Sequence, residues 1–302
     1  MPDRIPSGPR ALAGAAHSHL RIVSYNMLNG GRNSDGSCDR LTAQIDMLQE
    51  LDPHVVCLQE AKRWERNGGH WINMIAAALK MEARLALSAS HGCHLVTLVR
   101  PPGIRFLRFY PDVAEGNFHH TVSRADLQVD GVDAPLRVLH THLDPFDPAD
   151  RLAEARWLTQ YGDRDDTLLV GDLNSEAPGD PEPDTWNWLP PTQYSGNRIQ
   201  HPDGSYGSLD KRAMSALLAA GYVDPAADLR LEFARTAGHW GEDGRDHRSD
   251  YILPSRNLSW RMGSYTVVDT PRARRASDHL PVVADLYTEP RPADAPSLLE
   301  GP

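Results

Sequence analysis

The sequence predicts an α/β protein in which mixed β-sheets are covered by helices on their outer sides. Short segments rich in Val, Ile and Leu recur along the chain, and helical patterns lie between several of the early ones. In the middle of the chain, neighbouring strand segments are joined by connections that suit hairpins. Parallel strands need long crossovers, whereas antiparallel strands can be joined by short turns. This combination favours mixed sheets over an all-parallel, doubly wound sheet.

Each element has a local justification in its residues. The helix expected at 41–51 carries Leu41, Ile45 and Leu48 on one face and is stopped by the Asp-Pro pair at 52–53. Further helices are expected at 71–80, 148–161 and 210–220; Asp147 is a candidate N-cap and Gly221 a stop signal. The expected strands have lengths and β-branched content typical of strands, and they span 20–25, 54–58, 94–99, 121–129, 136–140, 167–170, 250–253, 264–268 and 280–284.

Composition places the chain among globular proteins. Its 302 residues are 40% hydrophobic and 24% charged, and no apolar run approaches the ~20 residues that cross a bilayer. We expect a flexible leader at 1–19, a Pro-rich disordered tail at 288–302 and a cytoplasmic, monomeric protein. Three widely spaced cysteines suggest neither a zinc knuckle nor a disulfide framework.

The net charge of −10 bears on the substrate. Proteins that grip many phosphates of a nucleic acid normally present a basic surface, so this charge favours a small substrate over DNA or RNA. The one dense basic run, 272–275, is interpreted as a solvated loop. The stretch 174–209 lacks periodicity but contains Trp186, Trp188 and Tyr194, which favours a substrate-facing loop over a disordered one.

Polar residues that can carry chemistry gather where the expected strands begin or end. Side chains at such positions can converge on one site. The set comprises Asn26, Glu60, His142, Asp172, Asn174, Asp250, Asp278 and His279.

Oxygen ligands dominate this set, and no sulfur accompanies them. Carboxylate and amide oxygens suit Mg²⁺, with Mn²⁺ as an alternative, rather than zinc. Converging carboxylates repel one another unless a divalent cation lies among them, and histidines can move a proton or hold a phosphoryl oxygen near neutral pH. Taken singly, most of these residues favour structural roles such as turns and caps; only the ordered set indicates a site.

Six short motifs give the set its order along the chain: SYN at 24–26, LQE at 58–60, THLD at 141–144, GDLN at 171–174, SDYIL at 249–253 and SDHLPV at 277–282. With these motifs the chain resembles the endonuclease/exonuclease/phosphatase superfamily with the deoxyribonuclease I-like fold. The resemblance covers about 20–287, which implies a single domain over that range. It implies a four-layer α/β/β/α sandwich of two mixed sheets.

The resemblance also implies roles for individual residues. Glu60 resembles the main metal ligand, with Asn26 beside it at the metal or phosphate. His279 resembles the general base or a phosphate-contacting histidine, and Asp250 resembles the carboxylate that orients it. Whether Asp172 or His279 takes the proton from water is left open.

Five further residues complete the implied site. Asp172 and Asn174 resemble the pair that positions the attacking water and stabilises phosphoryl oxygens. His142 resembles a second phosphate-binding histidine, and Asp278 resembles a direct or outer-sphere metal ligand. Arg124 lies on a strand that can carry a phosphate-binding residue in the family; a surface role is equally compatible with its position.

The function expected from these observations is Mg²⁺-dependent hydrolysis of a phosphate ester, by a phosphodiesterase or phosphatase acting on a small-molecule or lipid-type substrate. A repair-type DNA or RNA nuclease of the same superfamily is the alternative, and a catalytically silent binding scaffold is a third. The scaffold is disfavoured because a protein without catalysis does not need both histidines and all the carboxylates.

Overall fold

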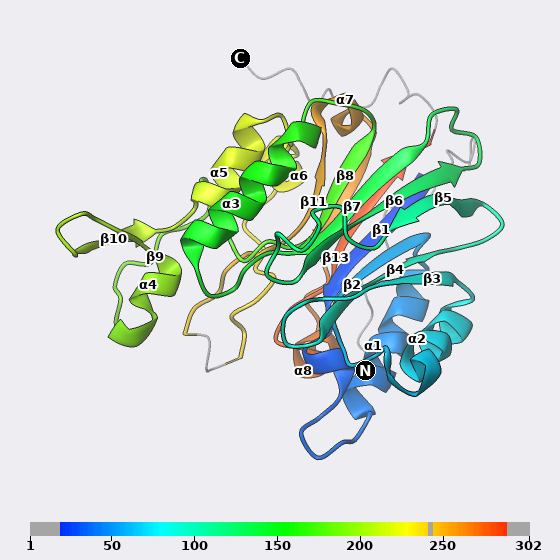
Figure 1. Cartoon of the computed structure of the whole chain (residues 1–302), viewed down its shortest axis with the longest axis horizontal. Coiled ribbons are helices and arrows are strands. Elements are labelled where there is room, and N and C mark those ends of the chain that lie inside the picture. The colour runs from blue at the N-terminus through cyan, green and yellow to red at the C-terminus, as the bar shows by residue number, and fades with distance from the viewer. Residues whose placement is uncertain (1–18, 241–243, 289–302) are drawn as a thin grey trace.

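Two large β-sheets form the centre of the molecule in the computed structural model, which describes residues 19–240 and 244–288. The first has six strands in the order β12-β13-β1-β2-β4-β3, and the second has five in the order β11-β8-β7-β6-β5. Both are mixed, since β1 pairs in parallel with β2 and β7 with β8 while the other pairs are antiparallel. A separate two-stranded ribbon, β10-β9, stands apart from them (Figure 1).

The strands are β1 (His19–Asn26), β2 (Val55–Lys62), β3 (Glu82–Ala86), β4 (Cys93–Val99), β5 (Ile104–Tyr110), β6 (Thr121–Val129), β7 (Leu136–His142), β8 (Thr167–Asp172), β9 (Arg198–Gln200), β10 (Tyr206–Leu209), β11 (Asp250–Pro254), β12 (Met262–Val267) and β13 (Val282–Tyr287). The α-helices are α1 (Asp39–Leu51), α2 (Arg66–Leu79), α3 (Pro148–Leu158), α4 (Tyr194–Asn197), α5 (Arg212–Ala219), α6 (Pro225–Asp228), α7 (Arg256–Ser259) and α8 (Pro271–Ala276). Single 3₁₀ turns are η1 (Asn29–Gly31), η2 (Thr159–Tyr161) and η3 (Pro191–Gln193).

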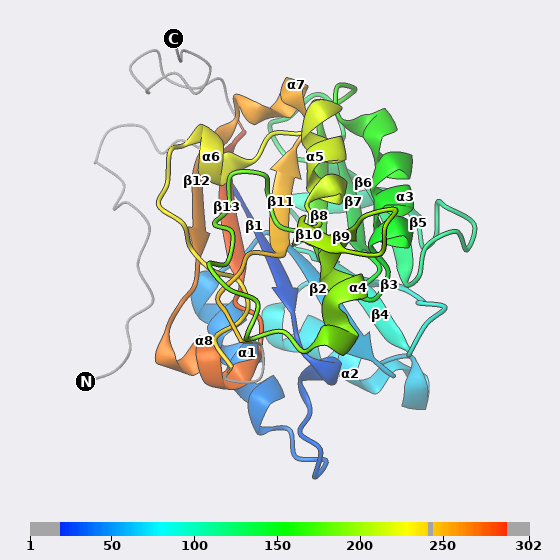
Figure 2. The same ribbon diagram turned by 90° about the vertical axis from the view of Figure 1, so that its left-hand side faces the viewer.

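Three apolar cores hold four layers together. Residues from the inner faces of both sheets, such as Ile22 and Val170, form the central core. A second core lies between the six-stranded sheet and helices α1, α2 and α8, and a third between the five-stranded sheet and helices α3 and α5. Figures 1 and 2 show these two groups of helices on opposite outer sides. The expected sandwich of two mixed sheets with helices outside is therefore confirmed.

Most expected elements are present, and a few elements were not expected. Asp147 caps α3 by accepting a hydrogen bond from the backbone N–H of Ala149 at 2.7 Å, as its position before Pro148 predicts. Strands β3 and β5 were not expected. The stretch 174–209 is also more ordered than expected, because it contains η3, α4 and the β9–β10 ribbon.

The expectation that the basic run at 272–275 forms a solvated loop is wrong, because this run lies in helix α8. Arg272 pairs with Glu50 and Arg274 with Asp269, so these two charges are neutralised within the protein. Apart from His19 and Thr288, the expected leader and tail lie outside the described residues. No helix in the described ranges is long and apolar enough to span a membrane.

Candidate active site

The strand registers bring the central site residues into one row. At the end of the five-stranded sheet, His142 of β7 is the register partner of Asp172 of β8, and Asp172 is the partner of Asp250 of β11. Like charges placed directly opposite on neighbouring strands are destabilising. The Asp172–Asp250 pair therefore needs a compensating positive group.

His279, from the turn before β13, supplies that group. Its Nδ1 lies 2.8 Å from Asp250 Oδ2 and 3.7 Å from Asp172 Oδ2. Both carboxylates are essentially buried, whereas the His279 side chain keeps 16% of its surface exposed. The imidazole is thus held from inside by Asp250 and open to solvent on another side.

Mutual electrostatics fix the charge states of these three groups. Burial alone would lower the pKa of His279, but the carboxylates of Asp250 and Asp172 raise it well above its usual value. Burial raises the pKa of Asp250. Burial also acts to raise the pKa of Asp172, but the adjacent His279 and His142 lower it below its usual range. At neutral pH, Asp172 is an anion beside a histidine cation.

Asn26 links this row to the opposite sheet. Its Nδ2 donates to Asp172 Oδ2 at 3.0 Å and faces Glu60 Oε1 at 3.3 Å. Its own Oδ1 accepts the backbone N–H of Leu28 at 3.1 Å, which fixes the amide orientation. Glu60 lies at an irregularity of β2 between Leu58 and Ala61 and has φ = 54°, a left-handed conformation that is costly outside glycine. This bulge places the Glu60 carboxylate beside Asn26.

The Gly-Asp-Leu-Asn turn has a steric requirement for its first residue. A Cβ on Gly171 would lie 1.9 Å from the carbonyl oxygen of Thr141, so only glycine permits β8 to approach β7 this closely. Asn174 adopts φ = 47°, its backbone N–H donates to Asp172 Oδ1 at 3.0 Å, and its Nδ2 donates to Leu143 O at 2.9 Å. The turn therefore holds Asp172 from its own backbone.

His142 is fixed by packing as much as by hydrogen bonding. Its Nε2 lies 3.5 Å from Asp172 Oδ2, and its ring stacks on that of His120 with centroids 4.4 Å apart. Its Nδ1 is buried and has no hydrogen-bond partner in the described part of the chain. Burial, assisted by His142 and His119, lowers the pKa of His120 to about 2, so His120 stays neutral against the His142 ring.

The donor set at this site fits a divalent metal. The Asn26 amide faces Glu60 and Asp172 at once, so two carboxylates converge on one small group. Hard oxygen donors of this kind suit Mg²⁺ or Mn²⁺. A second arrangement is offered by Asp172, Asp250 and His279, whose potential ligand atoms lie within 4.8 Å of one another. Because His279 Nδ1 already bonds Asp250, the oxygen set around Glu60 is the better match.

The structure joins seven of the nine residues expected from the sequence through direct contacts, and an eighth, Asp278, lies close enough to His279 to help raise its pKa. Asp278 is half-buried, and its Oδ1 accepts from Ser277 Oγ at 3.2 Å. Arg124 is not brought to the site. It pairs in register with Leu139, which packs against helices α3 and α5 on the outer face, and its guanidinium is bound by Asp126 at 2.7 and 2.9 Å.

Sequence reasoning missed a residue that supports Asp250. The hydroxyl of Thr236, fully buried, accepts the backbone N–H groups of Ser249 at 3.0 Å and Asp250 at 3.1 Å. Its carbonyl also accepts from the N–H of Leu280 at 2.6 Å, next to His279. Thr236 thereby ties the strand bearing Asp250 to the turn bearing His279. It belongs to none of the six motifs, so only the tertiary structure identifies it.

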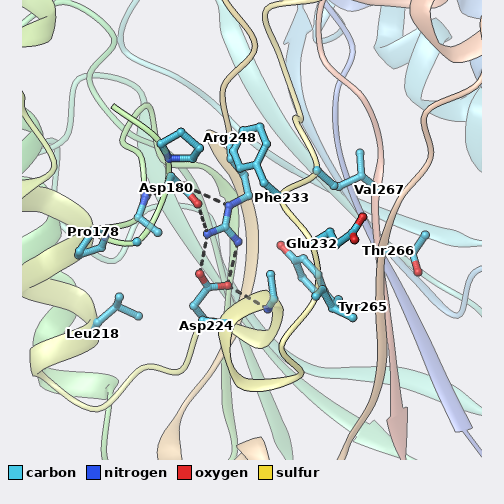
Figure 3. A pocket seen from close by; sticks show the side chains of 17 residues that line it. Pro178, Asp180, Leu218, Asp224, Glu232, Phe233, Arg248, Tyr265, Thr266 and Val267 are labelled. Carbon is cyan, nitrogen blue, oxygen red and sulfur yellow. Dashed lines mark hydrogen bonds and ion pairs between the residues drawn. The ribbon is translucent and has the colours of Figure 1, made fainter. Parts of the chain in front are cut away.

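Arg248, two residues before Asp250, is one of the residues that line an apolar cavity of about 480 Å³. Figure 3 shows Arg248 between Asp180 and Asp224, with Leu218 and Phe233 also lining the cavity. None of the nine residues expected at the site lines it. This cavity is therefore separate from the candidate active site, although Arg248 connects the two along the chain.

A model of the endonuclease/exonuclease/phosphatase family matches residues 23–279, and the chain belongs to this family. No curated protein matches the sequence. Among solved structures, an AP endonuclease from Archaeoglobus fulgidus is 22% identical, with a TM-score of 0.60 over 88% of this chain and 98% of that one. An endonuclease/exonuclease/phosphatase from Bacteroides vulgatus is 13% identical, with a TM-score of 0.63 over 90% and 100%. Truncated TDP2 from Caenorhabditis elegans is 15% identical, with a TM-score of 0.59 over 89% and 98%. At these identities the structural likeness establishes the fold.

Proposed function

We propose that this member of the endonuclease/exonuclease/phosphatase family is a divalent-metal-dependent hydrolase of phosphate esters and acts on a small-molecule or lipid-type substrate. The observation that carries the proposal is the position of Asp172. This buried carboxylate lies within reach of Asn26, His142 and His279 and is ionised beside a histidine cation.

Asp172 is the group best suited to accept the proton of the attacking water. Its depressed pKa keeps it ionised, and hydrogen bonds from Asn26 and from the backbone of Asn174 fix its two oxygens. In hydrolysis, the water oxygen forms a bond to phosphorus as the bond to the leaving alcohol breaks, and the alkoxide takes a proton from solvent. No residue needs to form a covalent bond to phosphorus.

His279 and His142 would contact the phosphoryl oxygens. Asp250 keeps His279 protonated and oriented through its 2.8 Å hydrogen bond, so a positive N–H group is available where negative charge develops. The carboxylate of Glu60, placed by the bulge of β2, would hold the metal, and the Asn26 amide, whose Nδ2 donates to Glu60 and Asp172, would position these two carboxylates. When bound, such a metal polarises a phosphoryl oxygen and offsets the charge of the carboxylates.

The preference for a small substrate rests on charge. The net charge is −10, and the chain contains only three lysines: Lys62, Lys80 and Lys211. Near Glu60, Lys62 lies in β2 and donates to Asn29 Oδ1 at 2.7 Å, while Arg66 is paired with Glu65 at 3.4 Å. Arg63 is exposed nearby and would be available to a nucleic-acid backbone, so a nuclease remains the alternative.

A substrate panel tests this proposal. The purified full chain is assayed with Mg²⁺ on bis-p-nitrophenyl phosphate, p-nitrophenyl phosphate, sphingomyelin-like lipids and supercoiled plasmid. Asp172→Asn serves as the inactive control and Asp203→Asn, in an exposed turn, as the matched active one. Cleavage of a small or lipid ester by wild type and Asp203→Asn alone supports the proposal. Plasmid nicking at lower enzyme concentration than any ester cleavage would favour the nuclease, and equal rates for Asp172→Asn would refute the role of this site.

A further inference from the structure

A small polar cavity of about 90 Å³ opens directly beside the candidate active site. Its lining includes Asn174 and also Ser249, the neighbour of Asp250. The other lining residues come from helix α3 and the turn before it, from the stretch 174–210 and from the segment before β11. The organic group of an ester whose phosphorus is held at Asn174 would therefore lie at the opening of this cavity.

Glu176 presents an unsatisfied acceptor in this lining. The residue is only 8% exposed, and one of its oxygens, Oε1, is bound by Arg245. The other oxygen, Oε2, is buried and has no hydrogen-bond partner in the described ranges. Buried carboxylate oxygens are normally satisfied, and the exceptions call for an explanation such as a missing ligand.

Arg151, on helix α3, presents a complementary donor group. It is 5% exposed, and its hydrogen bonds go to two backbone carbonyls, those of Asp144 at 2.7 Å and Gly196 at 3.4 Å. No carboxylate lies within ion-pair distance of it among the residues described. Burial lowers the pKa of Arg151, and the carboxylates of Asp144, Asp210, Asp172 and Glu154 offset part of that cost from a longer distance.

The remaining charges around the cavity are already accounted for. Both oxygens of Asp210 are bound by Arg212. Burial lowers the pKa of His247 to about 4, so this ring is neutral at pH 7. The cavity thus offers one unsatisfied acceptor, Glu176 Oε2, and one cation, Arg151, whose hydrogen bonds among the residues described go only to backbone carbonyls.

These two groups select for hydroxyls. A hydroxyl donates one hydrogen bond and accepts others, so a pair of hydroxyls can satisfy Glu176 and Arg151 together. An alkyl group would satisfy neither, and a second phosphate would face the Glu176 carboxylate. Because a water molecule occupies roughly 30 Å³, the cavity holds about three water-sized groups, which is the scale of a diol-bearing fragment.

We propose that this cavity is a specificity subsite, and that the substrates of the enzyme are phosphate esters of polyols or sugars whose hydroxyls bind Glu176 and Arg151. The inference rests on the proposed function and narrows it to one substrate class. It disfavours DNA, since the deoxyribose of an intact strand carries no free hydroxyl.

Matched ligands test the subsite independently of turnover. 3,4-Dihydroxybutylphosphonate and butylphosphonate are the P–C analogues of glyceryl and propyl phosphate; they differ in two hydroxyls and have no P–O–C bond to hydrolyse. Both compounds are titrated calorimetrically into the full chain with Mg²⁺. We expect the dihydroxybutyl compound to bind at least about tenfold more tightly, the scale of a hydrogen bond to a charged group. Glu176→Gln is expected to bring the ratio within about threefold. The control Glu232→Gln, at the separate apolar cavity, is expected to leave it unchanged.

The glyceryl and propyl p-nitrophenyl phosphodiesters are then assayed for hydrolysis. Hydrolysis of both esters at equal kcat/KM, with equal binding of the two phosphonates, would overturn the subsite and leave the proposed function standing. Preferential binding of the dihydroxybutyl compound without hydrolysis of any ester would support the subsite and contradict the proposed function. The wild-type ligand comparison decides the matter even if Glu176→Gln does not fold.

Discussion

Two buried clusters, each of two aspartates and one cation, meet near the start of β11, where Arg248 of one cluster lies two residues before Asp250 of the other. The two clusters differ in how completely their polar atoms are hydrogen-bonded. In one, Arg248 donates to both Asp180 and Asp224 at 2.6–3.1 Å. In the other, His279 bonds Asp250 at 2.8 Å but lies 3.7 Å from Asp172.

The difference extends to the acceptors. Asp180 and Asp224 each accept a further backbone N–H, from Ala177 and Ala226, so their oxygens are well satisfied. In the His279 cluster, Asp250 Oδ1 is buried without a partner in the described part of the chain. A fully bonded cluster fixes structure, whereas an incompletely bonded one retains capacity to bind and to move protons. The Arg248 cluster therefore suits a structural role at the start of β11, and the His279 cluster suits the catalytic role proposed for it.

Asp172→Asn is expected to have the largest effect on activity. Asparagine keeps the shape but cannot accept the proton of water, so kcat should fall at least about a hundredfold. Stability should change little, with Tm within about 3 °C, because the substitution also removes the like charge opposite Asp250. Turnover and thermal unfolding measured on the same preparation check this. Near-wild-type turnover would eliminate Asp172 as the base.

Arg248→Met is expected to show the opposite profile. It leaves Asp180 and Asp224 buried without their cation, which should cost about 3–5 kcal/mol of unfolding free energy in urea titrations. Adding Asp180→Asn and Asp224→Asn should restore part of that loss. A stable Arg248→Met protein with normal activity would show that the cluster is not structural.

Glu154 extends the comparison to a buried carboxylate bound mainly by backbone N–H groups. Burial raises its pKa from 4.5 to about 7. Between these values the unfolded chain ionises Glu154 while the folded chain does not. Stability from this group is therefore full below pH 4.5, falls as pH rises, and levels off above pH 7, by up to about 3 kcal/mol. Glu154→Gln should remove this slope in urea titrations at pH 4.5, 6 and 7.5, and an unchanged slope would assign it to other groups.

Arg124→Ala is expected to have the smallest effect. Its guanidinium is bound by Asp126 on the outer face of the sheet, so kcat/KM should change less than twofold and stability by at most about 1 kcal/mol. A tenfold rise in KM would instead restore the phosphate-binding role that the sequence suggested.

Arg124 illustrates what sequence reasoning could and could not predict. Side chains alternate between faces along a strand, so the strand itself was predictable but the face of Arg124 depends on its register with β7. Conversely, the six motifs correctly predicted that the site residues lie at strand ends. The registers of β7, β8 and β11 then place His142, Asp172 and Asp250 side by side, which the sequence alone did not show.

The unexpected strands show the limit of local pattern. Strand β3, with the sequence EARLA, consists largely of helix-favouring residues, and only its pairing with β4 makes it extended. The contacts of Thr236 and Glu176 are likewise with residues far along the chain, with no signal in the neighbouring sequence.

The Mg²⁺ dependence of bis-p-nitrophenyl phosphate hydrolysis tests the central claim most directly. Turnover by the full chain should be abolished by EDTA and restored by excess Mg²⁺, and Glu60→Gln should need at least about tenfold more Mg²⁺ for half-maximal rate. Turnover that survives EDTA, or an unchanged Mg²⁺ requirement in Glu60→Gln, would contradict a metal-dependent site centred on Glu60 and Asp172.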